Sequence, residues 1–147
     1  MTFRPLHLLI AYDDTHGLCG RVVPRMKTLL EDRAFRISTL ELQDAPSELE
    51  LSDYHGLVLG TPAMGLGLRG VGPSPRVRAF VESLGPLEEL KVAIFCVFEG
   101  RPGYTLRNTR QLVLDHGGQV VATQAYWVLR PTLDEHVLPA ECMVRIR

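Results

Sequence analysis

Two adjacent carboxylates, Asp13 and Asp14, stand directly after the first apolar run of the chain, and His16 follows two residues later. The next segment has helical periodicity, and the free N–H groups and the dipole at a helix start attract anions. Two uses of the acids stay open. They could cap and solvate the loop, or the Asp14 carboxylate could itself occupy the anion cradle, where it would repel a phosphate. A protonated His16 would offset that repulsion.

Two further loops have residues suited to contact with a flat ligand. The segment 61–73 is rich in glycine, which lets a ligand or another backbone approach closely. Phe98 and Tyr104 border the second loop, and Tyr104 is the better-placed residue for stacking. Met64 and Leu66 could add apolar contact. The backbone groups expected to hydrogen-bond a ring edge are those of Thr61, Ala63, Gly100 and Gly103.

Alternating strand and helix patterns surround these loops. Buried-type apolar runs predict strands, and apolar residues at helical spacing predict helices. We expect strands over 6–12, 35–42, 55–60, 91–98 and 119–123, and helices beginning near 20, at 75 and at 105. Pro24 is compatible only with the first turn of its helix, Ser74 is the expected N-cap of the next, and Gly117 ends the last. Segment 126–129 could extend the last strand, and 133–147 could add a helix.

This order of elements predicts the fold class. Strand and helix alternate about five times, which favours an α/β protein with a parallel sheet covered by helices on both faces. The crossover between the second and third strands looks compressed. Ligands of such sheets bind beyond the carboxyl ends of the strands, where the strand order reverses. This selects the loops 13–20, 61–73 and 98–104 as the expected site.

Composition limits the class of protein. The 147 residues fit one domain over 1–147, and 16 basic against 17 acidic side chains give a net charge of -1, so we expect no nucleic acid partner. Three cysteines without a C-x-x-C pair favour a reducing, cytoplasmic location. We expect no signal peptide and no membrane span, because no apolar run is long enough.

Other kinds of chemistry are weakly supported. Cys19 and Arg25 have the C-x5-R spacing of low-molecular-weight tyrosine phosphatases, but Cys19 stands seven residues after Tyr12 rather than directly behind the strand. A receiver domain would need an aspartate at the end of the third strand, where Thr61 stands instead. The histidines show no spacing that would gather them around a metal, so no metal site is predicted.

The three loops carry a family resemblance. The segment Y-D-D-T-H-G-L-C over 12–19 resembles the phosphate loop of flavodoxins, roughly Y-D-S-x-x-G-N-T, and L-V-L-G-T-P over 57–62 resembles their third strand. The segments 73–84, 91–98 and 100–104 resemble the helix, strand and second flavin loop that follow. The resemblance covers nearly the whole chain. It implies a flavodoxin-like, doubly wound three-layer sandwich with a five-stranded parallel sheet in the order 2-1-3-4-5.

The resemblance also implies FMN as the cofactor, with its phosphate at the first loop and its ring between the other two, and a redox protein partner for electron transfer or flavin-dependent reduction. The cofactor-binding residues that it implies are Asp13, Asp14, Thr15, His16, Gly17, Leu18, Cys19, Thr61, Pro62, Ala63, Met64, Gly65, Phe98, Glu99, Gly100, Gly103 and Tyr104.

The chain departs from the family pattern at four of these positions. Asp14, His16 and Cys19 stand where hydroxyls are usual, and Leu18 stands where asparagine is usual. Two functions therefore stay open. One is an FMN-binding protein. The other is a domain that keeps the fold without the flavin and acts as an interaction or regulatory module, for which a homodimer through loop 61–73 is one form.

Overall fold

The computed structural model describes residues 5–44, 49–63 and 72–129. Their centre is a parallel sheet of five strands in the order β2-β1-β3-β4-β5, which confirms the predicted order. The strands are β1 (His7–Tyr12), β2 (Arg36–Glu41), β3 (Gly56–Pro62), β4 (Lys91–Phe98) and β5 (Gln119–Trp127).

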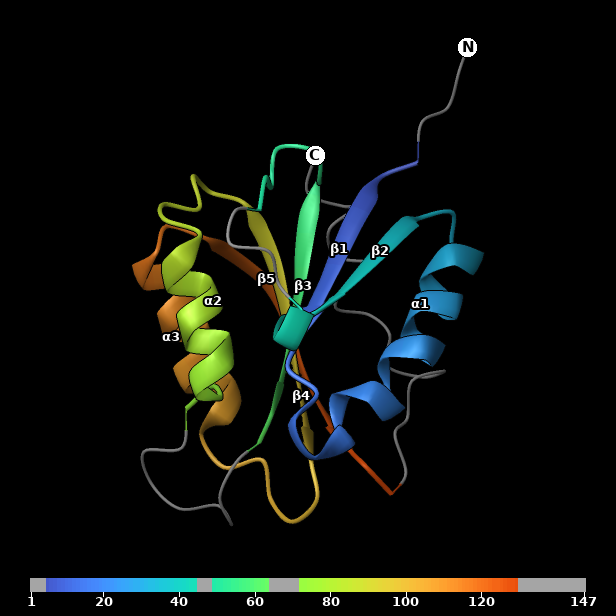
Figure 1. Ribbon diagram of the computed structural model, residues 1–147, viewed down its shortest axis with the longest axis vertical. Coiled ribbons are helices and arrows are strands. Elements are labelled where there is room, and N and C mark those ends of the chain that lie inside the picture. The colour runs from blue at the N-terminus through green and yellow to red at the C-terminus, as the bar shows by residue number, and fades with distance from the viewer. Residues whose placement is uncertain (1–4, 45–48, 64–71, 130–147) are drawn as a thin grey trace.

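Helices cover both faces of this sheet (Figure 1). In that view, helix α1 (Val23–Asp32) lies to the right, while α2 (Pro75–Ser83) and α3 (Thr105–Asp115) lie to the left. Successive strand residues point to opposite faces, so each strand supplies two cores. Leu8 and Ile10 of β1 pack in the core beneath α1, and Leu9 and Ala11 pack in the core beneath α2 and α3. The predicted three-layer sandwich is therefore present.

Helix α1 begins later than its apolar pattern alone predicts. Two 3-10 turns, Thr15–Gly17 and Cys19–Arg21, lie between β1 and the first residue of α1, Val23. Pro24 stands in the first helical turn, where its missing N–H costs no intrahelical hydrogen bond. The proline thus limits how early the helix can begin, and α1 begins at Val23, three residues after the expected start near Gly20.

The connection from β2 to β3 is compressed, as predicted. In the part of this connection that the structure describes, the only helical element is the 3-10 turn Leu42–Asp44. The last strand is longer than predicted, because β5 runs to Trp127 and Val128 still donates its N–H to the Phe98 carbonyl oxygen at 3.0 Å. The expected helix over 133–147 lies outside the described residues. Among those described, no helix is both long and apolar enough to span a membrane.

Candidate functional site

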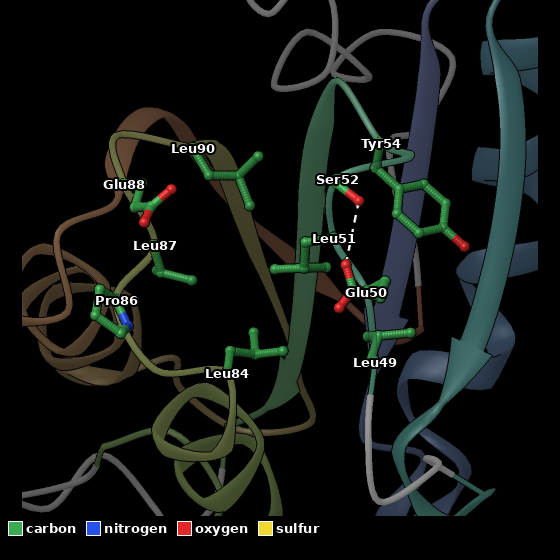
Figure 2. A pocket seen from close by; sticks show the side chains of 10 residues that line it. All are labelled: Leu49, Glu50, Leu51, Ser52, Tyr54, Leu84, Pro86, Leu87, Glu88 and Leu90. Carbon is green, nitrogen blue, oxygen red and sulfur yellow. Dashed lines mark hydrogen bonds between the residues drawn. The ribbon is translucent and has the colours of Figure 1, made fainter.

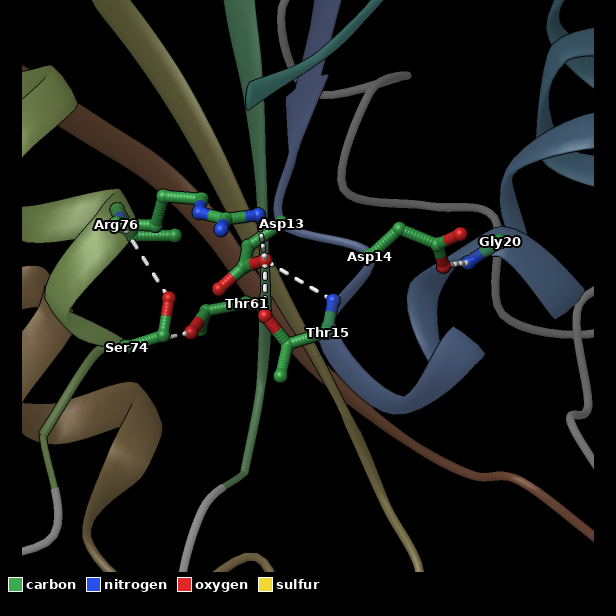
Figure 3. A network of polar contacts seen from close by, with 8 residues as sticks. Asp13, Asp14, Thr15, Gly20, Thr61, Ser74 and Arg76 are labelled. Carbon is green, nitrogen blue, oxygen red and sulfur yellow. Dashed lines mark hydrogen bonds and ion pairs between the residues drawn. The ribbon is translucent and has the colours of Figure 1, made fainter. Parts of the chain in front are cut away.

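The Asp13 side chain organises the loop that follows β1 (Figure 3). Its exposed fraction is 1%, and its Oδ1 accepts hydrogen bonds from the Thr15 N–H at 3.0 Å and from the Thr15 hydroxyl at 2.6 Å. The first bond closes a turn from an aspartate to the backbone two residues on, which is a common use of this side chain. The Asp13 N–H donates to the Gly60 carbonyl oxygen at 3.1 Å, so the loop is also tied to β3. Asp13 therefore holds the loop in place.

Arg76 and Gln43 complete this network, and the sequence analysis identified neither. The Arg76 guanidinium lies 3.9 Å from Asp13 Oδ1, so a cation from the first turn of α2 faces a buried carboxylate at the end of β1. With its amide oriented for hydrogen bonding, Gln43 accepts from Arg76 at 2.7 Å and donates to Glu41 at 3.1 Å. No local sequence signal links these positions, because the sheet order brings them together.

Asp14 points the other way and binds the start of the helical turn beyond the loop (Figure 3). Its Oδ1 accepts a hydrogen bond from the Gly20 N–H at 2.6 Å. A Cβ atom placed on Gly20 would lie 2.5 Å from the same oxygen, so the carboxylate occupies the space that any other residue would fill. This is the arrangement that the sequence offered as one of two uses of Asp14.

The remaining residues of the first loop divide into buried and exposed ones. The side chains of Leu18 and Cys19 belong to the core beneath α1, while His16 and Gly17 are exposed in left-handed backbone conformations. Burial raises the pKa of the Cys19 thiol well above its usual value, and Asp13 and Asp14 raise it further. A reactive thiolate is the charged form that such surroundings disfavour. The structure therefore gives no support to the phosphatase-like interpretation of Cys19 and Arg25.

The loop that follows β3 is anchored through Thr61. The Thr61 hydroxyl oxygen accepts a hydrogen bond from the Ser74 N–H at 3.0 Å and donates to the Pro62 carbonyl oxygen at 3.1 Å. The Ala63 N–H donates to the Val97 carbonyl oxygen at 2.9 Å, so it is already engaged within the sheet. Pro62 is buried and Ala63 half-buried. Met64 and Gly65 lie outside the described residues.

The loop that follows β4 presents aromatic side chains. Tyr104, at the start of α3, is 45% exposed, and the Arg107 guanidinium lies 5.6 Å from its ring centroid. Trp127, at the end of β5, is 44% exposed and donates from its indole N–H to the Glu99 carbonyl oxygen at 3.1 Å. Phe98 is half-buried, whereas Glu99, Gly100 and Gly103 are exposed. Trp127 alternates with Tyr126 and Val128, which are both buried, so only the tryptophan of these three residues is exposed at this end of β5.

A hollow lies at the end of the sheet opposite the three loops (Figure 2). Its volume is about 430 Å³, and leucines of the segments 49–54 and 84–90 face one another across it. These segments precede β3 and β4, so the hollow is remote from the three loops at the carboxyl ends. It is adjacent to the compressed crossover from β2 to β3. Among the described residues, no group of three or more histidine, cysteine or acidic side chains is arranged to hold a metal ion.

The comparisons with known proteins support the fold. No protein-family model matches the sequence, and no curated protein matches it. Among solved structures, the two-electron reduced flavodoxin of Megasphaera elsdenii superimposes with a TM-score of 0.77 at 19% identity, covering 94% of this chain and 98% of that one. A mutant flavodoxin from Pseudomonas aeruginosa gives a TM-score of 0.70 at 16% identity, covering 95% and 97%. A mutant Fusobacterium nucleatum flavodoxin bound to flavin mononucleotide gives 0.61 at 14%, covering 93% and 90%.

These likenesses and the strand order define the class of fold. The chain has the flavodoxin-like fold, with its loops at the carboxyl ends of the strands and the reversal of strand order between β1 and β3. Because the sequence identities are below 20%, these comparisons show a shared fold and do not show a shared function.

One of these flavodoxins is bound to flavin mononucleotide, and the loop after β1 of this chain does not fit the phosphate of such a ligand. The N–H groups of Thr15, Gly17 and Gly20 already donate to oxygen atoms of Asp13 or Asp14. The Thr15 hydroxyl likewise donates to Asp13.

Proposed function

We propose that this chain is a flavin-binding protein of the flavodoxin type, which carries electrons or serves a flavin-dependent reduction. The observation that carries the proposal is the likeness to flavodoxins over nearly the full length of both chains, at a TM-score of 0.77 for one of them. The flavodoxin from Fusobacterium nucleatum among these neighbours holds flavin mononucleotide. A bound flavin would supply the electron or hydride chemistry, and the protein would supply position and surroundings.

The loops after β3 and β4 are the proposed contacts of the ring. Tyr104 offers an exposed aromatic face, and stacking on such a face needs no particular polar partner. The backbone of Thr61, Gly100 and Gly103 is the proposed source of hydrogen bonds to the ring edge. The exposed aromatic surface of Trp127 beside the same loop is suited to a redox protein partner, because aromatic residues are enriched at protein contacts.

A cytoplasmic setting and a single domain over 1–147 belong to the same proposal. Cys19, in the turn before α1, and Cys96, on β4, are buried free thiols, which suits a reducing compartment. Whether the chain acts alone or as a homodimer through loop 61–73 is tested by measuring its mass in solution with and without flavin.

The direct test is titration of the purified protein with flavin, following quenching of flavin fluorescence and the change in its visible spectrum. Saturable binding of FMN or riboflavin in the micromolar range or tighter is the expected result. Failure of both flavins to bind would overturn the proposed function while leaving the fold unaffected.

Replacing the exposed tyrosine tests the ring site. We expect Tyr104→Ala to weaken flavin binding by about 1–3 kcal/mol, by analogy with the stacking of bases on aromatic side chains. Tyr104→Phe keeps the ring and should bind as the natural chain does. Leu114→Ala is the matched control, because Leu114 is also an exposed apolar residue of α3 but stands near the other end of that helix. An unchanged dissociation constant for Tyr104→Ala would reject the stacking role.

A second candidate function rests on Asp14. The Asp14 carboxylate accepts the hydrogen bond of the Gly20 N–H, so the domain could keep the fold without any flavin and act as an interaction or regulatory module. One fold hosts many functions, so the fold does not decide between the two. A chain that binds no flavin in the titration, yet forms a defined complex with itself or another protein, would favour this candidate.

A further inference from the structure

The first observation is that oxygen atoms of Asp13 and Asp14, two carboxylate oxygens and one backbone carbonyl oxygen, accept the hydrogen bonds of N–H groups in the loop after β1. Asp14 alone takes two of the donors, since its carbonyl oxygen accepts from the Gly17 N–H at 2.8 Å and its carboxylate from the Gly20 N–H at 2.6 Å. The carboxylate is half-buried. An anion that entered this loop would have to displace a charged group that is already hydrogen-bonded there.

The second observation concerns Gly20. Its backbone is not in the left-handed region, so the conformation does not require glycine. The space favours glycine as long as Asp14 keeps this orientation, because a Cβ would lie 2.5 to 2.9 Å from three atoms of the Asp14 carboxylate group, which would then have to move. Gly20 therefore provides room for the Asp14 carboxylate, and the two residues act together although they are six positions apart in the chain.

The negative charge of Asp14 affects which ligands the loop after β1 can bind. The N–H groups of the turn that leads into α1 attract negative charge, and the Asp14 carboxylate already provides one such charge at the Gly20 N–H. A phosphate dianion placed nearby would be repelled, and partial burial weakens the screening of that repulsion. A ligand with a neutral end at this position meets no such repulsion.

We propose that Asp14 closes the loop after β1 to phosphate, so that the site selects a flavin without a phosphate group, of the riboflavin class, over FMN. This inference rests on the proposed function and deepens it, because it names which flavin the site takes. The Asp14 carboxylate supplies the negative charge that a phosphate would otherwise bring.

Parallel titrations with riboflavin and FMN test the proposal on the full chain. The natural chain should bind riboflavin at least about tenfold more tightly than FMN, since charges a few Å apart near a surface repel strongly. Asp14→Ser should strengthen FMN binding at least about tenfold and leave riboflavin binding within about twofold. Asp14→Asn removes the charge but keeps an acceptor for Gly20, so its gain for FMN separates charge from occupancy.

Two controls make the result specific. Asp32→Asn makes the same chemical and charge change at the last residue of α1, and it should alter neither affinity. A flavin-free measurement uses inorganic phosphate at constant ionic strength: phosphate should raise the thermal midpoint of Asp14→Ser and leave that of the natural chain unchanged.

The outcomes distinguish this inference from the proposed function. Equal or tighter binding of FMN by the natural chain would overturn the inference and support flavin binding. If no flavin binds the natural chain or either Asp14 variant, the proposed function fails and takes the riboflavin preference with it. The measurement with inorganic phosphate then tests by itself whether Asp14 keeps phosphate out of the loop. An equal shift of the thermal midpoint in Asp14→Ser and in the natural chain would overturn that idea.

Discussion

Asp13 and Asp14 are neighbours in the chain, yet their carboxylates have separate partners. Asp13 faces inward toward Thr15 and Arg76, whereas Asp14 faces the turn that leads to α1. A paired acid in a loop is easily interpreted as one site for one ligand. The structure shows instead one carboxylate that fixes the loop and one that occupies the start of the next turn.

The inward carboxylate gives a residue-scale prediction. Asp13→Ala removes the acceptor of two hydrogen bonds from Thr15 and should lower the free energy of unfolding by about 1–3 kcal/mol. Asp13→Asn keeps an acceptor oxygen and should cost less. Arg76→Ala should cost less than about 1 kcal/mol, because its side chain is 46% exposed and exposed ion pairs contribute little. Urea unfolding followed by circular dichroism measures each value, and a larger loss for Arg76→Ala would contradict this ranking.

At the scale of elements, the contact between β3 and β4 depends on one small residue. Gly60 stands opposite Phe95 in the strand register, and a Cβ on Gly60 would overlap the tip of the Phe95 ring. The phenylalanine ring thus covers the glycine. The two strands can pack in this way only because a large residue on one strand stands opposite a small residue on the other.

Gly60→Ala should therefore overpack the sheet and lower the free energy of unfolding by about 1–3 kcal/mol. Gly72→Ala is the matched control, since its Cβ would meet its nearest atoms at 3.7 Å, an ordinary contact. The double variant Gly60→Ala with Phe95→Leu should recover part of the loss. Equal stability of Gly60→Ala and the natural chain would show that the ring moves freely and would refute the overpacking.

Helix α2 supplies a second prediction at this scale. The Ser74 hydroxyl oxygen accepts a hydrogen bond from the Val77 N–H at 3.3 Å and so caps the helix, as the sequence predicted. Ser74→Ala should cost about 1 kcal/mol of unfolding free energy, and Ser74→Asp should retain most of the stability. Chemical unfolding of the three proteins side by side measures this. A loss of similar size in Ser74→Asp would place the effect in packing rather than in the cap.

At the scale of the whole molecule, buried thiol and phenol groups with raised pKa values make the stability depend on pH. Burial raises the pKa of the Cys96 thiol to about 12, and it also raises the pKa values of Cys19 and Tyr126. Unfolded thiols lose their protons near pH 9, about three units lower than Cys96 does when folded. The stabilisation is therefore complete below about pH 9 and is lost as the pH rises toward 12.

We expect the free energy of unfolding to fall between about pH 9 and pH 12, by up to about 1.4 kcal/mol per pH unit for each such group. Cys96→Ala should flatten this slope, whatever it does to stability at neutral pH. Unfolding curves at several pH values measure the slope directly. A slope that is unchanged in Cys96→Ala would show that the thiol titrates alike in both states.

The sequence by itself determined the elements whose signals are local. The apolar run 91–98 predicted β4 at its full length, Ser74 and Pro75 marked the start of α2, and Gly117 ended α3 with a backbone φ of +83°. Patterns of burial and capping act within a few residues, so one sequence suffices to recognise them. The position of the loops after β1, β3 and β4 at the carboxyl edge of the sheet follows in the same way from the alternation of strands and helices, whereas their use as a binding site stays a prediction.

Only the tertiary structure decided which side chains meet. The pairing of Asp13 with Arg76, of Gly60 with Phe95 and of Trp127 with Glu99 joins positions far apart in the chain. The extension of β5 beyond residue 123 likewise depends on its pairing with β4. Whether Asp14 would cap, solvate or fill the loop was open for the same reason: its partner, Gly20, became identifiable only once the turns between β1 and α1 fixed the path of the backbone. Contacts of this kind follow from the packing of whole elements, which no short stretch of sequence specifies.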